Sequence, residues 1–161
     1  MAKLIENNEV KGIQLKEGQT VLDVEGNEYL IEKGDILQER TGDWRLPDKE
    51  ELNLMYRNLH LKGIGRFANE YYWSSSVSSS YIAWYQYFND GTQDSIFIKD
   101  FSLRVRTVRV FKLQEGDAYS IGQETETGFV FDIQRDIIFE CKKQDEPKEM
   151  SWDEAMKDFG A

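Results

Sequence analysis

Apolar positions recur along this chain with two different periods, and each period predicts a different kind of element. In residues 48–62 they recur every three or four positions, which is the spacing of an amphipathic helix. The stripe consists of Leu52, Met55, Tyr56 and Leu59. Asp48, followed three residues later by Glu51, has the pattern of a capping box at the helix start. Gly63 and Gly65 are expected to end the helix.

In the second half of the chain the period changes to two, which predicts β-strands. Residues 81–88, YIAWYQYF, alternate along the whole segment. A tight turn at Asn89-Asp90-Gly91 and a returning strand at residues 95–98 complete a hairpin. Residues 103–111 are expected to form a further strand with a β-bulge near Arg106-Thr107, where the alternation slips by one position.

Both ends of the chain also carry strand signals. Residues 20–31 read as two short strands around a Gly-Asn turn, which residues 34–37 extend, and residues 1–40 are interpreted as an N-terminal β appendage. The polar stretch 112–127 is expected to be a linker or surface loop. Residues 128–141 are expected to form a hairpin of high strand propensity.

The last residues, EMSWDEAMKDFGA, have the pattern of a helix that starts at Ser151. Its apolar side chains share one face: Trp152, Ala155, Met156 and Phe159. An isolated helix of this length is not stable in water, so this face must dock on something.

Composition and charge narrow the classes of function. Hydrophobic residues make up 40% of the 161 positions and aromatic residues 13%, which suits a packed domain with sheets and binding faces. The formal net charge of -10 argues against a nucleic-acid partner, because a phosphate-binding face needs a positive surplus. Cys141 is the single cysteine, so neither an internal disulfide nor a cysteine-based zinc site within one chain is expected.

No stretch has the apolar length of a signal peptide or a membrane span. We therefore expect a protein that is made in the cytoplasm and has no membrane partner. It stays there, leaves by an unconventional route, or is incorporated into a particle assembled there, such as a phage virion.

Three stretches taken together resemble a known family: GDWRLPDKEELNLMY, NEYYWSSSVSSSYIAWYQYFNDG and RVRTVRVF. Their motifs and order are similar to those of a bacterial and phage domain family named after the C-terminal domain of a collagen-like adhesin. That family is related to the C-type lectin fold, to the variable proteins of diversity-generating retroelements and, more remotely, to the formylglycine-generating enzymes. The resemblance covers residues 42–111 and implies an α+β, C-type-lectin-like domain with small antiparallel sheets and two helices, here at residues 41–161.

In that family a helix similar to EMSWDEAMKDFG precedes the WRLP segment, and a hairpin similar to residues 128–141 precedes that helix. The resemblance therefore implies that residues 128–161 are circularly permuted and complete the domain from the other end. The Trp152/Met156 face is then expected to pack on the helix that carries Leu52 and Tyr56. Two alternatives stay open: exchange of the hairpin and helix with a neighbouring copy, and a cut within a tandem repeat that leaves the helix undocked.

The resemblance also implies a ligand-binding face rich in tyrosine and serine, a composition that gives rigid contact area and adaptable hydrogen bonds. The matching candidate residues are Ser76, Val77, Ser79, Ser80, Tyr81, Tyr85, Tyr87 and Asn89. The alternative is an ordinary exposed strand face, or one that is buried on the N-terminal appendage. Trp73, Trp84 and Phe88 match constant positions of the family and are expected to be core residues.

Other chemistries find little support in the sequence. Phe88-Asn89-Asp90 is similar to the calcium motif of sugar-binding lectins, but the companion tripeptide is absent, so a turn is favoured and no metal is expected. Arg104, Arg106 and Arg109 are expected to pair with acidic residues, with binding of an anion as the alternative.

No catalytic residues are predicted. His60 has no suggested partner for a triad. Cys141 is expected to be a small core residue, and a single cysteine lacks the pair that the formylglycine-generating enzymes use to hold copper. The acidic pairs Glu50-Glu51 and Asp153-Glu154 fit the first turns of helices, where they favour the helix dipole.

The sequence thus predicts a non-enzymatic ligand-binding or structural module without a cofactor. A phage virion component, such as a decoration, fibre or tail protein, is the favoured context, with a protein or glycan ligand and homo-oligomers or virion proteins as partners. The alternative is a secreted or surface adhesin domain, and a diverged formylglycine-generating-type enzyme is a remote one.

Overall fold

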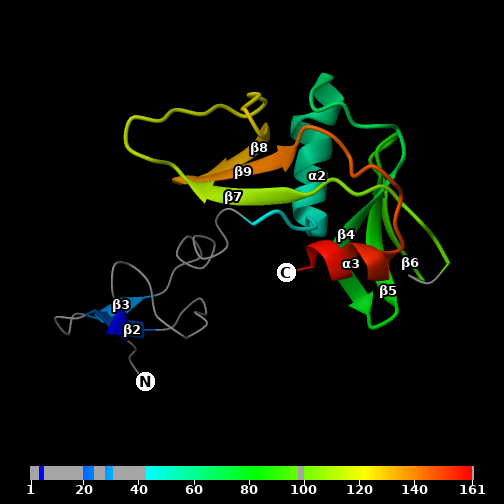
Figure 1. Ribbon diagram of the computed structural model, residues 1–161, viewed down its shortest axis with the longest axis horizontal. Helices are drawn as coiled ribbons and strands as arrows, with labels where there is room; N and C mark the ends of the chain where they lie inside the picture. Colours follow the sequence, from blue (N-terminus) through cyan, green and yellow to red (C-terminus); the bar gives the residue numbers. More distant parts are fainter. Residues whose placement is uncertain (1–3, 6–19, 24–27, 31–42, 98–99, 161) are drawn as a thin grey trace.

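The computed structural model describes residues 4–5, 20–23, 28–30, 43–97 and 100–160. From residue 43 onward the described chain is α+β, with two three-stranded antiparallel sheets and two α-helices (Figure 1). The predicted fold class is confirmed at this level.

The first antiparallel sheet has the strand order β4-β5-β6 and follows the chain as a meander. Its strands are β4 (Tyr71–Ser79), β5 (Ile82–Tyr87) and β6 (Gln93–Phe97). The β5–β6 turn occupies the predicted position, with a hydrogen bond of 2.7 Å from the Gly91 amide to the Tyr87 carbonyl. Gly91 has a φ of 84° there, a left-handed conformation that glycine adopts without strain.

The second antiparallel sheet has the order β7-β9-β8, so the strand from the middle of the chain pairs with the C-terminal hairpin. Its strands are β7 (Val108–Lys112), β8 (Gly128–Gln134) and β9 (Ile137–Lys142). The predicted hairpin at residues 128–141 is confirmed. Close packing requires glycine at position 128, because a Cβ there would lie 1.9 Å from the Cys141 carbonyl oxygen.

The prediction of one strand over residues 103–111 is wrong in its first half. Leu103 and Arg104 form isolated bridges, to Met150 and Tyr72, and regular pairing begins only at Val108. The chain crosses from the first sheet to the second over these residues. The slip in alternation therefore marks this crossing and not a bulge within one strand.

Helix α2 (Lys49–Asn58) begins with the predicted capping box, since Asp48 accepts from the Glu51 amide and the Glu51 side chain accepts from the Asp48 amide. It ends five residues before Gly63, which instead ends the short 3₁₀ helix η1 (His60–Lys62) with a φ of 73°. The buried side of α2 faces both sheets. Its core cluster joins Leu52, Met55 and Leu59 to Tyr72 and Phe88 of the first sheet and to Val108, Val110, Phe129, Phe131, Ile137, Phe139 and Cys141 of the second.

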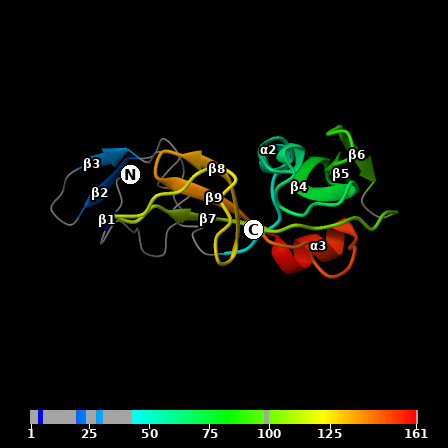
Figure 2. The ribbon, with the colours of Figure 1, turned by 90° about the horizontal axis from the view of Figure 1, so that it is seen from above.

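Helix α3 (Trp152–Phe159) has a Ser151/Glu154 capping box and docks within its own chain. The expectation that it packs on α2 is wrong. Figures 1 and 2 show α2 and α3 on opposite faces of the β4-β5-β6 sheet. Alternation explains the difference, because Tyr72 and Phe88 point towards α2 while Trp73 and Ala83 point towards α3.

The α3 side of the first sheet has a core cluster of its own. Its buried members are Leu46, Trp73, Ala83, Val105, Met150 and Ala155, with Tyr85, Ile96, Leu103, Trp152, Met156 and Phe159 partly buried around them. Two indole N–H groups connect the helix segment to β4, from Trp73 to the Met150 carbonyl at 2.8 Å and from Trp152 to the Ser74 carbonyl at 2.9 Å. An undocked C-terminal helix is therefore excluded.

Residues 113–127 form a loop that reaches the β8 edge of the second sheet. Val130 exchanges backbone hydrogen bonds with this loop, and the Tyr119 ring meets Phe111 edge to face. Below the loop, the buried Glu140 carboxylate accepts hydrogen bonds from Arg109, Thr125 and Thr127. The loop thus covers a buried charge that is fully hydrogen-bonded.

The N-terminal strands form a third, small sheet in the order β1-β2-β3. The predicted pair is confirmed as β2 (Thr20–Asp23) and β3 (Glu28–Leu30), which are antiparallel. Strand β1 (Leu4–Ile5) was not predicted and pairs in parallel with β2. The proposed extension at residues 34–37 lies outside the described residues.

Candidate functional site

The eight candidate residues do not form one face. Cross-strand register places them in four regions. Ser76 is packed against α2, Tyr85 and Tyr87 lie on the α3 side of the sheet, and Asn89 is in the β5–β6 turn. The remaining four lie at the other end of the sheet, at the β4–β5 turn: Val77, Ser79, Ser80 and Tyr81.

The serines of the YWSSS motif support the backbone where the β4–β5 register shifts. Ser74 donates to the Trp84 carbonyl and accepts from the Ser76 amide, and the Ser76 hydroxyl accepts from the Lys49 amide at 2.9 Å. Lys49 is the first residue of α2, where amides lack a partner within the helix. Ser76 is therefore a structural residue, and its assignment to the ligand-binding face is not supported by its position.

The β4–β5 tip, defined as residues 77–81 together with Phe97, exposes an unusual amount of apolar surface. Val77 is 50% exposed, Tyr81 61% and Phe97 62%, and Ser78, Ser79 and Ser80 between them are exposed as well. Ile82 pairs with Ser79 on one side and with Phe97 on the other, so Ser79, Ile82 and Phe97 form one row across the sheet.

Neither helix covers this row. Helix α2 begins beside the next row, where the Lys49 ammonium lies 4.2 Å from the centre of the Trp84 ring and the Gln93 side chain donates to the Lys49 carbonyl. The tip therefore projects beyond the helix start, and its apolar side chains face solvent in the described structure.

A second aromatic surface lies towards the other end of β5. The tyrosine cluster consists of Tyr71, Tyr85 and Tyr87; Tyr71 stacks on Tyr87 with ring centres 4.2 Å apart and meets Tyr85 edge to face. Partial burial and the nearby Asp94 carboxylate raise the pKa of the Tyr85 hydroxyl. Tyr71 is the central ring of the cluster, because it contacts both of the other tyrosines.

The expected core role is confirmed for Trp73 and Phe88 and is only partly correct for Trp84. Trp73 and Phe88 are buried on opposite sides of the sheet. Trp84 is half-buried, because it lies at the N-terminal end of α2, where only the Lys49 side chain extends over its ring.

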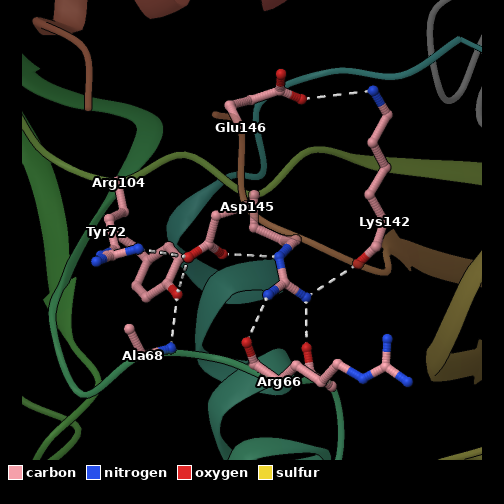
Figure 3. A network of polar contacts seen from close by, with 9 residues as sticks. Arg66, Ala68, Tyr72, Arg104, Lys142, Asp145 and Glu146 are labelled. Carbon is pink, nitrogen blue, oxygen red and sulfur yellow. Dashed lines mark hydrogen bonds and ion pairs between the residues drawn. The ribbon is translucent and has the colours of Figure 1, made fainter. Parts of the chain in front are cut away.

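The arginines of the RVR-x-VR motif pair with carboxylates, as predicted. Asp145 accepts from Arg106 Nε at 2.9 Å, from Arg104 at 3.2 Å and from the Tyr72 hydroxyl at 2.8 Å (Figure 3). Arg106 is completely buried, donates to the carbonyls of Gly65, Arg66 and Lys142, and lies over the Phe67 ring. This network connects the crossing segment, β4 and the segment after β9.

The WRLP motif is likewise structural. Arg45 makes a two-pronged ion pair with Glu51 at 2.7 Å for each contact, and both side chains are buried. Its backbone pairs with Val108, and the Leu46 amide donates to the Phe159 carbonyl at 2.9 Å. The motif thus joins α2, β7 and the end of α3.

The other residues that could be reactive, His60, Cys141 and Asp90, have contacts that indicate structural roles. His60 hydrogen-bonds to Asn69 and contacts the rings of Tyr56 and Phe88. Cys141 is buried, and burial raises the pKa of its thiol to about 11, so the reactive thiolate is scarce at neutral pH. Asp90 accepts from the Thr92 amide and orders the predicted turn.

Two general features of the described residues bear on function. No group of three or more His, Cys, Asp or Glu side chains in the part that the structure describes could hold a metal ion. Within the same residues, no helix combines the length and apolar character that a membrane crossing requires.

A groove that the sequence did not indicate lies beyond the end of β9. This Trp44 groove has a volume of about 430 Å³ and is lined by Trp44, Thr127, Lys142, Lys143, Gln144, Asp145 and Glu146. Arg109 and Lys142 lie 4.7 Å and 5.4 Å from the centre of the Trp44 ring.

Three exposed features were not predicted from the sequence: Phe97, Tyr71 and the Trp44 groove. Tyr71 and Phe97 occupy strand positions whose exposure depends on where the helices dock. The groove brings together residues 44, 127 and 142–146, and no local pattern indicates their proximity.

Comparison of the chain with protein-family models, with curated proteins and with solved structures finds no match.

Proposed function

We propose that this chain is a non-enzymatic binding or structural module whose principal contact surface is the β4–β5 tip. The observation that carries the proposal is the exposure of three large apolar side chains, Val77, Tyr81 and Phe97, at the same end of a small sheet. Large apolar side chains that gather in solvent at one end of a sheet support an interaction surface there. The serines between them add hydrogen-bonding groups, and tyrosine adds rigid contact area.

The tyrosine cluster is a second element of the proposed contact surface. Tyr85 and Tyr87 were candidate ligand residues, and Tyr71 joins them through its ring contacts. Because the cluster and the tip lie towards opposite ends of β5, a single small ligand does not reach both. A protein surface or an extended glycan does.

We further propose that the fold is C-type-lectin-like and circularly permuted. Support comes from the hydrogen bond between the Leu46 amide and the Phe159 carbonyl, which brings the end of α3 next to the WRLP segment. In the family that the sequence resembles, the corresponding helix leads directly into WRLP. The pairing of β7 with β9 likewise joins the resembling segment to the displaced hairpin.

A phage virion component, such as a decoration, fibre or tail protein that forms homo-oligomers or binds other virion proteins, is the context we favour. A secreted or surface adhesin domain that binds glycans or proteins uses the same surfaces and is the alternative. A diverged formylglycine-generating-type enzyme is a remote alternative, which stoichiometric copper in the pure protein would support.

The test compares wild-type protein with the double variant Tyr81→Ser/Phe97→Ser. Sedimentation velocity over a range of concentrations measures self-association, and a glycan array measures saturable saccharide binding. We expect the double variant to lose whichever of these two interactions the wild-type protein shows. The control is Leu61→Ser, because Leu61 is 62% exposed on η1, outside the tip.

A second double variant, Tyr85→Ala/Tyr87→Ala, tests the tyrosine cluster in the same assays. Circular dichroism confirms that each variant is folded. If wild-type protein self-associates or binds a glycan and the tip variant does so equally well, the tip is not the contact surface. If only the tyrosine variant loses the interaction, the principal surface lies on the α3 side.

A further inference from the structure

The Trp44 groove differs from the rest of this acidic chain in the charge that it presents. The side chains of Lys142 and Lys143 are 36% and 34% exposed, whereas those of Asp145 and Glu146 are 12% and 14% exposed. The lysine side chains are therefore more exposed to solvent than the two carboxylate side chains. A ligand that enters the groove meets positive charge first.

The carboxylates of the groove are also largely occupied. Both oxygens of Asp145 are bound, to Arg106 on one side and to Arg104 and Tyr72 on the other. Glu146 contacts Lys142 at 3.4 Å (Figure 3). Asp145 thus offsets the charges of the buried Arg106 and of Arg104, and Glu146 faces the Lys142 ammonium, so each carboxylate has a cationic partner.

The lysines, in contrast, retain donor capacity. An ammonium group has three N–H donors. Their ion pairs are long, 3.4 Å from Lys142 to Glu146 and 3.9 Å from Lys143 to Glu124. Such partly exposed pairs are weak, so an incoming anion can replace them.

The Trp44 ring adds a flat apolar wall. The Arg109 guanidinium, held by Glu140 and Thr127, lies against this ring and fixes its orientation. Gln144 lines the groove with an amide group, which has two N–H donors and an acceptor oxygen for the hydroxyls of a sugar. The groove therefore offers an aromatic surface, neutral polar groups and a cationic rim, in the volume range of small-ligand sites.

We propose that the Trp44 groove binds an acidic saccharide residue, a sugar whose single carboxylate meets Lys142 and Lys143 while its ring lies against Trp44. A singly charged carboxylate fits better than a doubly charged phosphate, because Asp145 and Glu146 repel the dianion more strongly. This site shares no residue with the β4–β5 tip and the tyrosine cluster, and it does not depend on their function.

The experiment is an NMR titration of the ¹⁵N-labelled full chain with glucuronate, which follows the indole N–H signal of Trp44. We expect saturable shifts with a dissociation constant on the order of 1 mM, as for a small ligand in an open site. Glucose, which lacks the carboxylate, is expected to bind about fivefold more weakly, and Lys143→Gln to weaken glucuronate binding by about the same factor.

Lys148→Gln is the matched control, because Lys148 is exposed, pairs with Glu154 and lies outside the groove lining. It is expected to leave the titration unchanged. The proposal is overturned if Trp44 shows no saturable shift, if glucose binds as well as glucuronate, if Lys143→Gln has no effect, or if inorganic phosphate binds more tightly. The tip variant Tyr81→Ser/Phe97→Ser should titrate like wild type, which separates this result from the test of the tip.

Discussion

At the scale of single residues, the side chains that look reactive in the sequence act as structural connectors. Arg45, Arg106 and Arg109 each bind a carboxylate that is itself buried or nearly so. Breaking such a pair by removing one partner leaves an uncompensated charge, which typically costs 3–5 kcal/mol. The motifs that carry the family resemblance are thus explained by packing, and the exposed surface lies between them.

Asp48 gives a prediction at this scale. Burial, together with the nearby Glu51, raises the pKa of the Asp48 carboxyl to about 6. Because this value lies above the ordinary pKa of about 4, the folded state binds more protons than the unfolded state between these two pH values. The contribution of Asp48 to stability is therefore present below pH 4 and is lost as the pH rises to 6.

Asp48→Asn removes this titration and keeps a good N-cap residue. We expect the free energy of unfolding of wild type, relative to the variant, to fall by about 1 kcal/mol between pH 4 and pH 7. This is less than the full pKa shift would give, because solvent screens the half-buried group. Urea denaturation at several pH values measures the difference, in which titrations common to both proteins cancel. A difference that stays constant across this range would contradict the prediction.

At the scale of elements, the position of α3 is the main finding. Its apolar face was predicted correctly, and the surface that it covers was not. The helix docks on Trp73 and Ala83 because the strand alternation turns these side chains away from α2. Two helices on opposite faces give this small sheet a core on each side.

Ala155 tests this docking, because it is completely buried between α3 and the sheet. Ala155→Glu is expected to destabilise the protein by about 3 kcal/mol or more, since it places a charge and extra volume in a filled space. Ala118→Glu makes the same chemical change at an exposed loop position and is expected to cost less than about 0.5 kcal/mol. Thermal unfolding of both variants checks this, and equal stabilities would show that α3 is not docked as described.

At the scale of the whole molecule, the segments that are most distant in sequence complete one another. Residues of the WRLP motif contact the end of α3, β7 pairs with β9, and Asp145 binds arginines about 40 positions earlier. The two sheets are therefore joined by C-terminal residues, and the α3 side of the first sheet is uncovered without them.

The proposed permutation can be tested by reversing it. A chain that starts at Asp117, continues through Gly160, passes through a short Gly-Ser linker to Asp43 and ends at Gly116 restores the order of the resembling family. We expect it to fold with the same circular dichroism spectrum and to lose about 2 kcal/mol or less, because Phe159 and Leu46 are already in contact and Gly116 lies in an exposed loop. A matched chain opened between Tyr85 and Gln86, inside β5, should not fold. If the first chain also fails to fold, the order of the segments matters more than their proximity.

The sequence by itself determined most of the elements, because helix caps, turn residues and apolar periods act over a few neighbouring positions. The Asp48/Glu51 and Ser151/Glu154 boxes, the β5–β6 turn and the β8–β9 hairpin all lie where these local signals place them. The pairing of the motif arginines with carboxylates was also foreseeable in an acidic chain, although the particular partners were not.

Only the tertiary structure decided which surfaces stay exposed. Ser76 is covered by the start of α2, Phe97 and Tyr71 remain open, and Trp44 meets residues 142–146 because β9 ends beside it. The physical reason is that exposure depends on how far each helix extends over the sheet and on which strands pair across long separations. These are properties of the whole packing, and no short segment of the chain contains them.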